Sequence, residues 1–541
     1  MEFYEKFCKN DLTKPSYRVY NTIDEERKIM VNKTMFKTTG SKNKRKIINE
    51  AGGKAYSLSD THALCQLAVT NCFNDVYYYS AQEVLNKVKD IVSKVDSETV
   101  AKIAVYSHEQ AKMKDMAAYL LAVLVSREEH VLLQKIFNRI VTNSKMLCNF
   151  VQIVRSGVLG VKSFGSVTKK LINNWLTSRT PDQLFNDSIG HSNPSLKDII
   201  RMTHPKPKDI VQSTIFAYIL GKNVEDRFIY LPERVQQYEI FKRDNSTILP
   251  DVDFRLLSNC KLTESHWKIL AKSMRWDMLR RNLNTLSRHN VLQDKELVQH
   301  IANVLSNKEI VKKQKVFPFE LLTTYLNAKE LPSKIQNALH DALEHATENI
   351  SDFETDTIVC VDVSSSMNSP ATGNRGSATS VTTCVQVAAL FASSILRKNS
   401  GETTVVPFDT SVKCINIDGR DSVMTNTKKL SLNGGGTDCS CALRHINNLG
   451  KKANLIVYIS DNQSWYQANG AMLGEWNRFK ANNPEAKMVL IDIQPYCNTQ
   501  CLDNKKVMNI GGFGDSQFTI INNFVRNGQV DFVKTIKEIK L

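Results

Sequence analysis

The chain has 541 residues, which is too many for a single hydrophobic core and predicts at least two domains. Hydrophobic residues make up 42% and charged residues 23%, values typical of an ordinary soluble globular protein. The formal net charge is +16 and is unevenly spread: residues 1–350 hold 52 Lys and Arg against 38 Asp and Glu, whereas residues 351–541 hold 19 against 17. This asymmetry indicates an acidic partner for the first two-thirds. Of the acidic partners, nucleic acid is favoured over a membrane surface. The alternative is that the basic surface has no binding role.

The first 50 residues are polar and include the basic run 41–46, which predicts a basic N-terminal arm. Residues 1–10 interleave charges and contain no apolar run, so we expect no signal peptide. No segment approaches the roughly 20 apolar residues that span a bilayer. The 12 cysteines include no CxxC pair of a zinc site, so we expect small buried thiols in a reducing cytoplasm.

Residues 51–350 show helical spacing of apolar side chains almost throughout. Val84, Val88 and Ile91 fall on one helix face, and the segments 132–140 and 211–219 repeat the pattern. Short polar breaks separate these segments. A long run of medium helices with brief links favours an α-solenoid of paired helices. Because no exact internal period is found, an irregular helical bundle is the alternative.

The pattern changes near residue 350, where the charge balance also changes. Residues 357–362 are a mostly apolar run that ends in Asp362, which predicts a buried parallel strand. Further strands are expected near 402–408, 412–417, 454–460 and 487–493, with helices near 381–398 and 517–526. Alternating strands and helices predict a doubly wound parallel sheet over residues 351–541.

Three short polar segments follow predicted strands or enter predicted helices in this α/β part. They are Asp362-Val-Ser364-Ser-Ser366, Gly434-Gly-Gly-Thr437-Asp438 and Ile459-Ser-Asp461-Asn462. Ligands of open α/β sheets bind outside the carboxyl ends of the strands, and Mg²⁺ prefers oxygen ligands such as these carboxylates and hydroxyls. The plain alternative is that the first segment is only a helix cap and turn. Since an unpaired charge directly after a buried run is costly, a metal site is the favoured interpretation.

The set Asp362, Ser364, Ser366, Thr437 and Asp461 resembles the metal-ion-dependent adhesion site of von Willebrand factor A domains. The resemblance implies that these five residues bind a divalent cation, Mg²⁺ first and Mn²⁺ second, with Thr437 acting directly or through water. Asp438 is expected to lie behind the ligands. An acidic residue of a partner protein completes the cation's shell in such a site, which implies a capacity for protein adhesion.

The segment Gly434-Gly-Gly-Thr-Asp-Cys-Ser440 is more particular and is similar to the GGTDCS segment of the Ro autoantigen, or TROVE-domain, family. Other similar segments come in the same order, so the resemblance covers about residues 50–527. They lie at 51–56, 197–208, 279–283, 317–322 and 511–524. The family fold implies a closed ring of HEAT-like helical repeats whose ends are fastened by the A-type domain. Family members bind small noncoding Y RNAs on the outer surface of the ring and take single-stranded 3′ ends of misfolded RNAs into its hole.

Charge and resemblance together predict a set of RNA-binding residues in the helical part: Lys169, Lys170, Arg201, His204, Lys206, Lys208, Arg280 and Arg281. By resemblance His204 contributes to Y RNA binding; the alternative is a helix C-terminal cap before Pro205. Each basic pair could instead be a solvated helix face. Residues 182–189 are less basic than the matching loop of familiar relatives, which bears on Y RNA binding more than on general RNA binding. The tyrosines at 77–79 could stack on bases, but helix packing is favoured.

The predicted function is therefore the binding of noncoding RNA, for surveillance or storage within a ribonucleoprotein, by a monomer with no membrane partner. The alternative is a metal-dependent adhesion module that recruits a nuclease or another protein through the A-type domain. The sequence contains no nucleophile elbow, P-loop or HExxH motif, and its candidate metal site lacks the carboxylate cluster of two-metal nucleases. We therefore expect that the protein is not an enzyme.

Overall fold

The computed structural model describes residues 45–189, 193–244, 248–258, 260–328, 330–465, 471–527 and 532–541. Residues 46–541 form one compact unit. Most of the predicted N-terminal arm, with residues 41–44 of its basic run, lies outside the described residues. Within the described ranges, no helix is both long and apolar enough to cross a membrane.

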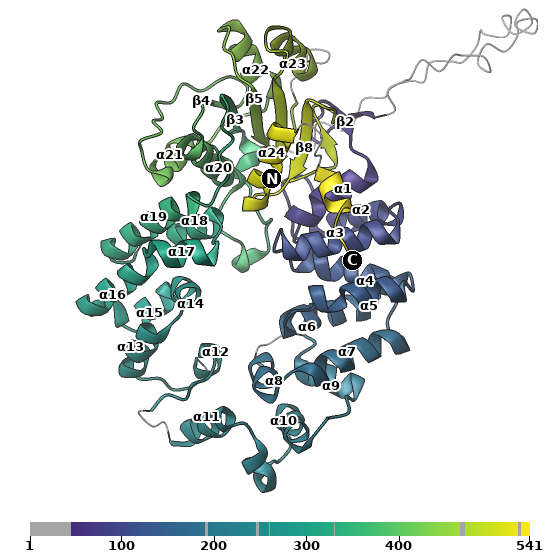
Figure 1. Ribbon diagram of the computed structural model, residues 1–541, viewed down its shortest axis with the longest axis vertical. Helices are drawn as coiled ribbons and strands as arrows, with labels where there is room; N and C mark the ends of the chain where they lie inside the picture. The colour runs from purple at the N-terminus through teal and green to yellow at the C-terminus, as the bar shows by residue number, and fades with distance from the viewer. Residues whose placement is uncertain are drawn as a thin grey trace, which may run out of the picture. The chain divides into compact units, whose positions relative to one another are not determined.

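A series of short helices makes up the first part of this unit and confirms the helical prediction (Figure 1). In chain order the helices are α1 (Asp60–Thr70), α2 (Ala81–Ser93), α3 (Ser97–Glu109), α4 (Asp115–Ser126), α5 (His130–Ile140), α6 (Ser144–Arg155), α7 (Ser166–Ser178), α8 (Pro181–Asp187), α9 (Leu196–Thr203), α10 (Ile210–Leu220), α11 (Glu233–Asp244), α12 (Phe254–Leu257), α13 (Glu264–Ser273), α14 (Trp276–Arg281), α15 (Leu283–Arg288), α16 (Lys295–Leu305), α17 (Lys308–Gln314), α18 (Pro318–Asn327) and α19 (Ser333–Thr347). Side-chain caps set several of the breaks. Thr180, for example, caps α8 in a capping box with Gln183, and Pro181 follows at the first helical position.

The apolar faces of these helices divide into two cores. The first contains the buried face of α2 with Val84, Val88 and Ile91, and extends through the helices up to α12. The second joins the helices from α11 to α19. Each core also includes side chains of the α/β part, such as Val361 in the first and Leu390 in the second. The helical series is therefore packed onto the α/β part through both of its cores.

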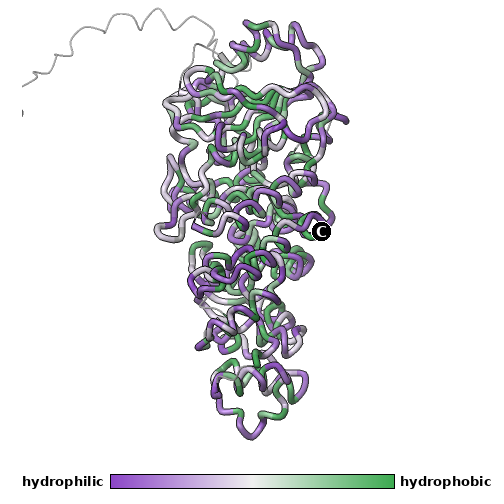
Figure 2. Tube along the Cα trace, turned by 90° about the vertical axis from the view of Figure 1, so that its left-hand side faces the viewer, coloured by the Kyte–Doolittle hydropathy of each residue, from purple (hydrophilic) through white to green (hydrophobic). Residues whose placement is uncertain are grey.

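The α/β part contains a five-stranded parallel sheet, as predicted. Its strands are β3 (Thr357–Asp362), β4 (Thr403–Phe408), β5 (Leu455–Ser460), β6 (Lys487–Asp492) and β8 (Val507–Gly511), in the order β4-β3-β5-β6-β8. Its helices are α20 (Cys384–Lys398), α21 (Val423–Leu430), α22 (Cys439–Asn448), α23 (Ala471–Asn482), α24 (Asp515–Asn527) and α25 (Phe532–Lys537). Figure 2 shows hydrophobic residues gathered along the strands.

Alternate residues of each strand serve opposite faces of the sheet. In β3, Val359 and Val361 pack with α20 and α24, whereas Ile358 and Cys360 pack with α22 and α23. A strand buried on both faces has little room for polar residues, which explains the continuous apolar runs in the sequence. Charged side chains are consequently confined to the ends of these strands.

The strand predicted near 412–417 was wrong. After β4 the chain turns at Asp409, whose carboxylate accepts a hydrogen bond from the Ser411 backbone. The returning chain makes an isolated bridge from Val412 to Phe408, and the Lys413 backbone donates to the Pro407 carbonyl at 2.8 Å. The segment therefore folds back along β4 as part of a turn and does not enter the parallel sheet.

Both ends of the helical series contact the α/β part. At the first end, α1 contacts β8 and α25, and the His62 side chain donates to the Asn509 carbonyl at 3.0 Å. At the last end, α19 contacts α20 and α21, and the Glu344 carboxylate accepts from the Val423 backbone at 2.6 Å. The helical series thus leaves the α/β part and returns to it.

The domain boundary placed at residue 51 differs from the observed structure. Strands β1 (Lys46–Ile48) and β2 (Lys54–Ser57) form a hairpin that pairs with β7 (Asn498–Thr499) of the α/β part. Gly53 lies in the turn of the hairpin, where an added Cβ would stand 1.9 Å from the Ser464 carbonyl oxygen. The hairpin is therefore an extension of the α/β part that precedes the helical series.

Replacing Gly53 with alanine should destabilise the protein, because a backbone oxygen cannot move aside as the end of a flexible side chain can. Overpacking of this kind costs about 1–3 kcal/mol, and we expect the melting temperature to fall by several degrees. Gly474→Ala is the matched control, since its Cβ would meet nothing within 4 Å on α23. Equal melting temperatures for the two variants would contradict the close approach at Gly53.

Candidate functional site

The predicted metal ligands meet at the carboxyl ends of β3 and β5. These strands are neighbours, with Val361 paired to Ile459, so Asp362 and Ser460 end the two strands side by side. From β3 the chain goes to β4 on one side and then crosses to β5 on the other side of β3, which makes the space between β3 and β5 the topological switch point. Open α/β sheets bind ligands in the crevice outside such a point.

The first loop fixes Asp362 through both of its carboxylate oxygens. One oxygen accepts from the Ser364 backbone at 2.9 Å, and the other accepts from the Ser460 hydroxyl at 2.6 Å. The Ser364 and Ser366 hydroxyls lie 3.3 Å apart. All three predicted ligands of this loop are buried, so a carboxylate and two hydroxyls converge out of contact with bulk water.

The second loop is held against the first by backbone contacts that need glycine. Gly434 donates to the Val363 carbonyl at 2.8 Å, and Ser365 donates to the Gly435 carbonyl at 2.8 Å. A Cβ on Gly434 would stand 2.2 Å from the Val363 oxygen, and one on Gly436 would stand 2.1 Å from the indole nitrogen of Trp465. The residue that follows, Thr437, is buried, and its carbonyl accepts hydrogen bonds from the Trp465 backbone and the Ser464 hydroxyl of the third loop.

The third loop brings in Asp461. One oxygen of its carboxylate accepts from the Gln463 backbone at 3.0 Å. The other oxygen, Oδ2, is buried and has no hydrogen-bond partner within 3.5 Å among the described residues, although the nearby Ser366 hydroxyl lowers the pKa of this carboxyl. The next residue, Asn462, has a φ of 60°, and its amide donates to the Asp492 carboxylate at 3.0 Å. The loop therefore presents one buried carboxylate oxygen that has no full hydrogen bond, beside the Ser366 hydroxyl.

Burial dominates the electrostatics of the two carboxylates. Desolvation raises the pKa of Asp362, and the neighbouring charge of Asp461 raises it further. Burial likewise raises the pKa of Asp461. Within the described ranges neither carboxylate pairs with Lys or Arg, and no group of three or more His, Cys, Asp or Glu could hold a metal. Two buried anions, an oxygen without a full hydrogen bond and two adjacent hydroxyls fit a hard divalent cation that takes mixed oxygen ligands.

The sequence analysis missed two polar residues at this site, and it correctly placed a third, Asp438, behind the predicted ligands. Asp438 caps α22 through the Ser440 backbone and pairs with Arg444, so it supports the loop and does not face the ligands. Ser460 and Asp492 were missed. Asp492 ends β6 as Asp362 ends β3, and burial raises its pKa. The rule that ligands lie at the carboxyl ends of strands could have identified it.

Six of the predicted RNA-binding residues lie on α7, on α9 and in the loop after α9, which are neighbours in Figure 1: Lys169, Lys170, Arg201, His204, Lys206 and Lys208. The Asn173 amide of α7 donates to the Thr203 carbonyl at the end of α9, which joins the two helices. Lys169 is half-buried and the other five are exposed. None of the six forms an ion pair with a residue that the structure describes. We call these six residues the basic cluster.

The structure bears on both roles considered for His204, the helix C-terminal cap and the RNA contact. Its backbone is left-handed, with a φ of 49°, and caps the C-terminus of α9 by donating to the Ile200 carbonyl. Its side chain is exposed beside Lys206 in the basic cluster. The cap uses only the backbone, so the imidazole is available to a ligand.

Arg280 does not fit the RNA-binding prediction. Its side chain is only 6% exposed and is bound to Asp277, to Thr324 and to both the carbonyl and the carboxylate of Glu320. Two neighbours on a helix point about 100° apart, so one member of a basic pair can turn inward. Arg281 is the exposed member; it pairs with Asp277 and lines a polar cavity of about 300 Å³ between α14 and α18.

Three comparisons with known proteins agree with this architecture. The family model described as the Ro60 vWA domain matches residues 357–525. The RNA-binding protein RO60 of Deinococcus radiodurans is 21% identical over 454 residues, which cover 78% of this chain and 84% of that protein. The crystal structure of the Deinococcus radiodurans RO (RSR) protein has a TM-score of 0.59 at 16% identity, covers 87% of this chain and 100% of that one, and shows that the two share a fold. Together these findings support a relationship to the Ro, or TROVE-domain, family: the α/β part matches the family's vWA domain, and most of the chain is similar to RO60.

Proposed function

We propose that this protein binds noncoding RNA through its helical series, without catalysis. The observation that carries the proposal is the basic cluster: six basic side chains, five of them exposed, on two adjacent helices and the loop that follows. Exposed cations that lack an acidic partner attract phosphates. The likeness to a relative named as an RNA-binding protein supports the same conclusion.

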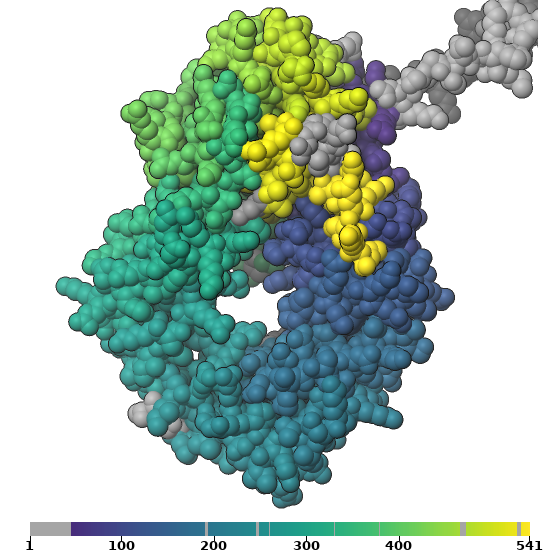
Figure 3. Space-filling view, viewed as in Figure 1, coloured from purple at the N-terminus to yellow at the C-terminus, as the bar shows by residue number. Residues whose placement is uncertain are grey.

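We further propose that the RNA is small or misfolded and carries a single-stranded 3′ end, which enters an opening within the helical series. Both ends of the series contact the α/β part, and Figure 3 shows an opening between its blue and teal segments. Such an arrangement supports a closed ring. An opening lined by protein would admit a single strand more readily than a duplex.

A divalent cation, Mg²⁺ first, is proposed for the site formed by Asp362, Ser364, Ser366, Thr437 and Asp461. The cation would neutralise the buried carboxylates and would satisfy the Asp461 oxygen that has no full hydrogen bond. A second candidate function is recruitment of a nuclease or another protein through this site. It is favoured by one observation, that an oxygen-rich site of this kind stands at the switch point of the sheet.

Replacing Arg201, His204, Lys206 and Lys208 together with alanine tests RNA binding. We expect affinity for a structured RNA to fall by tenfold or more, because three phosphate-attracting charges are lost. The slope of log affinity against log salt should become shallower by about one for each phosphate contact removed. Filter binding or fluorescence anisotropy at several salt concentrations measures both quantities.

The matched control removes the same charge elsewhere on the helical series. Lys308, Lys312 and Lys313 of α17 are replaced with alanine; two of them form surface pairs with Glu348, which contribute little to stability. If the basic cluster is the RNA-binding surface, the control variant should bind RNA almost as tightly as the unmodified protein does. An equal loss in the two variants would show that only overall charge matters and would contradict the proposal.

A further inference from the structure

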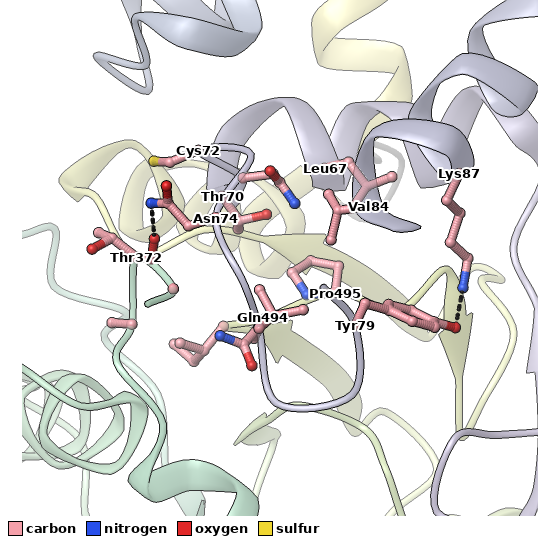
Figure 4. A pocket seen from close by; sticks show the side chains of 15 residues that line it. Leu67, Thr70, Cys72, Asn74, Tyr79, Val84, Lys87, Thr372, Gln494 and Pro495 are labelled. Carbon is pink, nitrogen blue, oxygen red and sulfur yellow. Dashed lines mark hydrogen bonds between the residues drawn. The ribbon is translucent and has the colours of Figure 1, made fainter. Parts of the chain in front are cut away.

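Two of the cavities that border the helical series differ in what they can hold. The one in Figure 4 lies between the loop after α1 and the α/β part, and its volume of about 20 Å³ is enough for a single water molecule. Its lining is committed to this junction: the Asn74 amide donates to the Thr372 carbonyl at 2.7 Å, and the Tyr79 ring packs on Tyr496. Tyr78 packs on the same ring, so the prediction that these tyrosines pack among helices was wrong for this pair. This first cavity is a packing gap and not a ligand site.

The second is the polar cavity between α14 and α18, which α15 also lines. Its volume of about 300 Å³ lies at the lower end of the range of small-ligand sites. Most of the side chains that line it are polar, and three of them are exposed: Arg281, Asn284 and Asn327. In Figure 1 α14 and α18 lie on the side of the helical series that borders the opening seen in Figure 3. A strand in that opening would therefore pass beside this cavity.

The charges around the polar cavity cancel. The buried Arg280 lies 2.8 Å from the Asp277 carboxylate and 2.6 Å from the Glu320 carboxylate. Arg281 lies 2.9 Å from the other carboxylate oxygen of Asp277. Because two arginines face two carboxylates, this wall has no surplus of positive charge with which to offset the desolvation of an anion. The cavity therefore favours an uncharged polar group over a terminal phosphate.

Two side-chain amides of the polar cavity offer unused acceptors. The Asn284 amide nitrogen donates to the Asn327 carbonyl at 3.0 Å, and the Asn327 amide nitrogen donates to the Thr323 carbonyl at 2.8 Å. Each bond uses the nitrogen, and no residue that the structure describes donates to the side-chain oxygen of either asparagine. Two neighbouring acceptors without net charge suit a ligand that presents two neighbouring hydroxyl donors.

We propose that the polar cavity holds the last nucleotide of the RNA strand that enters the opening, and that the oxygens of Asn284 and Asn327 accept hydrogen bonds from its free 2′- and 3′-hydroxyls. This inference rests on the RNA binding proposed above and adds the chemistry of the strand's end. A ribose 2′-hydroxyl is a donor as well as an acceptor, and only an RNA end without a phosphate presents it beside a free 3′-hydroxyl. An RNA that ends in a free diol is then held more tightly than the same RNA ending in a phosphate.

The test compares one RNA hairpin whose 3′ tail ends either in free 2′- and 3′-hydroxyls or in a 3′-phosphate, bound to the full chain in competition assays. We expect the free end to bind about tenfold more tightly, as for two hydrogen bonds between uncharged groups. In Asn284→Leu, which keeps the approximate size of the side chain and removes one acceptor, this difference should shrink to about threefold. Asn303→Leu is the matched control, because this exposed asparagine of α16 lies outside the cavity; it should keep the full difference.

A tail with a 2′,3′-dideoxy end separates the loss of donors from the added charge of the phosphate, and it should bind as weakly as the phosphorylated tail. If all three ends bind equally but more tightly than a blunt hairpin, strand entry stands and recognition of the end falls. If the tail gives no advantage over the blunt hairpin, strand entry and this inference fall together. An unchanged difference in Asn284→Leu would place the end elsewhere. Adenosine 5′-monophosphate has the same diol, and competition by it as strong as that of the tailed RNA would assign the cavity to a free nucleotide and overturn the proposal.

Discussion

Asp362→Ala should abolish Mg²⁺ binding, with an affinity loss of at least about 100-fold. Asp362 is buried at the end of β3, where both of its oxygens are positioned by Ser364 and Ser460. Removing it leaves Asp461 as the only carboxylate among the five predicted ligands, and a hard cation loses most of its charge neutralisation there. Titration calorimetry measures the loss directly.

Thermal unfolding gives an independent reading of the same variant. A ligand at about 100 times its dissociation constant stabilises the folded state by about 2.7 kcal/mol, so Mg²⁺ should raise the melting temperature of the parent and not that of Asp362→Ala. Asp421→Ala is the control, since this half-buried aspartate pairs with Lys429 away from the site. A Mg²⁺-dependent rise of equal size in Asp362→Ala would remove the proposed site.

RNA affinity of Asp362→Ala separates the two candidate functions. The basic cluster lies on α7, on α9 and in the loop after α9, and the proposed metal site lies at the carboxyl ends of β3 and β5. We therefore expect the variant to bind RNA as the parent does. A parallel loss of Mg²⁺ and RNA binding would mean that the cation is needed to hold the RNA surface in place.

The sequence was informative where one local pattern decides the structure. The runs that became β3 and β5 are apolar on both faces, and this pattern alone predicts a buried parallel strand. The candidate metal ligands could be predicted to lie together because each follows a strand or enters a helix, and strand ends of a parallel sheet converge. The segment 412–417 lacks such a context: its few apolar residues follow a turn at Asp409 and pair only with β4.

The sequence was uninformative where the partner of a residue is distant in the chain. The Asn74 amide, in the loop between α1 and α2, donates to the Thr372 carbonyl, nearly 300 positions later, and no periodicity in either segment encodes that contact. Arg280 and Arg281 form one basic pair in the sequence, yet α14 buries the first and exposes the second. Which face of a short helix turns inward depends on its neighbours, here the Glu320 and Thr324 side chains of α18.

An RNA hairpin with a single-stranded 3′ tail should bind more tightly than the same hairpin with a blunt end, by about tenfold or more. The tail would enter the opening in the helical series, whereas the duplex would be held by the basic cluster on its surface. Changing the bases of the tail should matter little, because contacts to phosphates carry no sequence information. Competition binding with tailed, blunt and 5′-tailed hairpins measures the preference.

Salt dependence shows whether the tail is held through its phosphates. For a single strand, log affinity falls against log salt with a slope of about −0.7 for each phosphate neutralised, so the tailed hairpin should show the steeper slope. Replacing Arg201, His204, Lys206 and Lys208 with alanine should lower the affinity for the blunt hairpin. Most of the difference in affinity between the tailed and the blunt hairpin should remain. Equal affinities and equal slopes for tailed and blunt RNA would exclude entry of a strand into the opening. The basic cluster would then be the whole binding surface, and the contacts of both helical ends with the α/β part would serve stability alone.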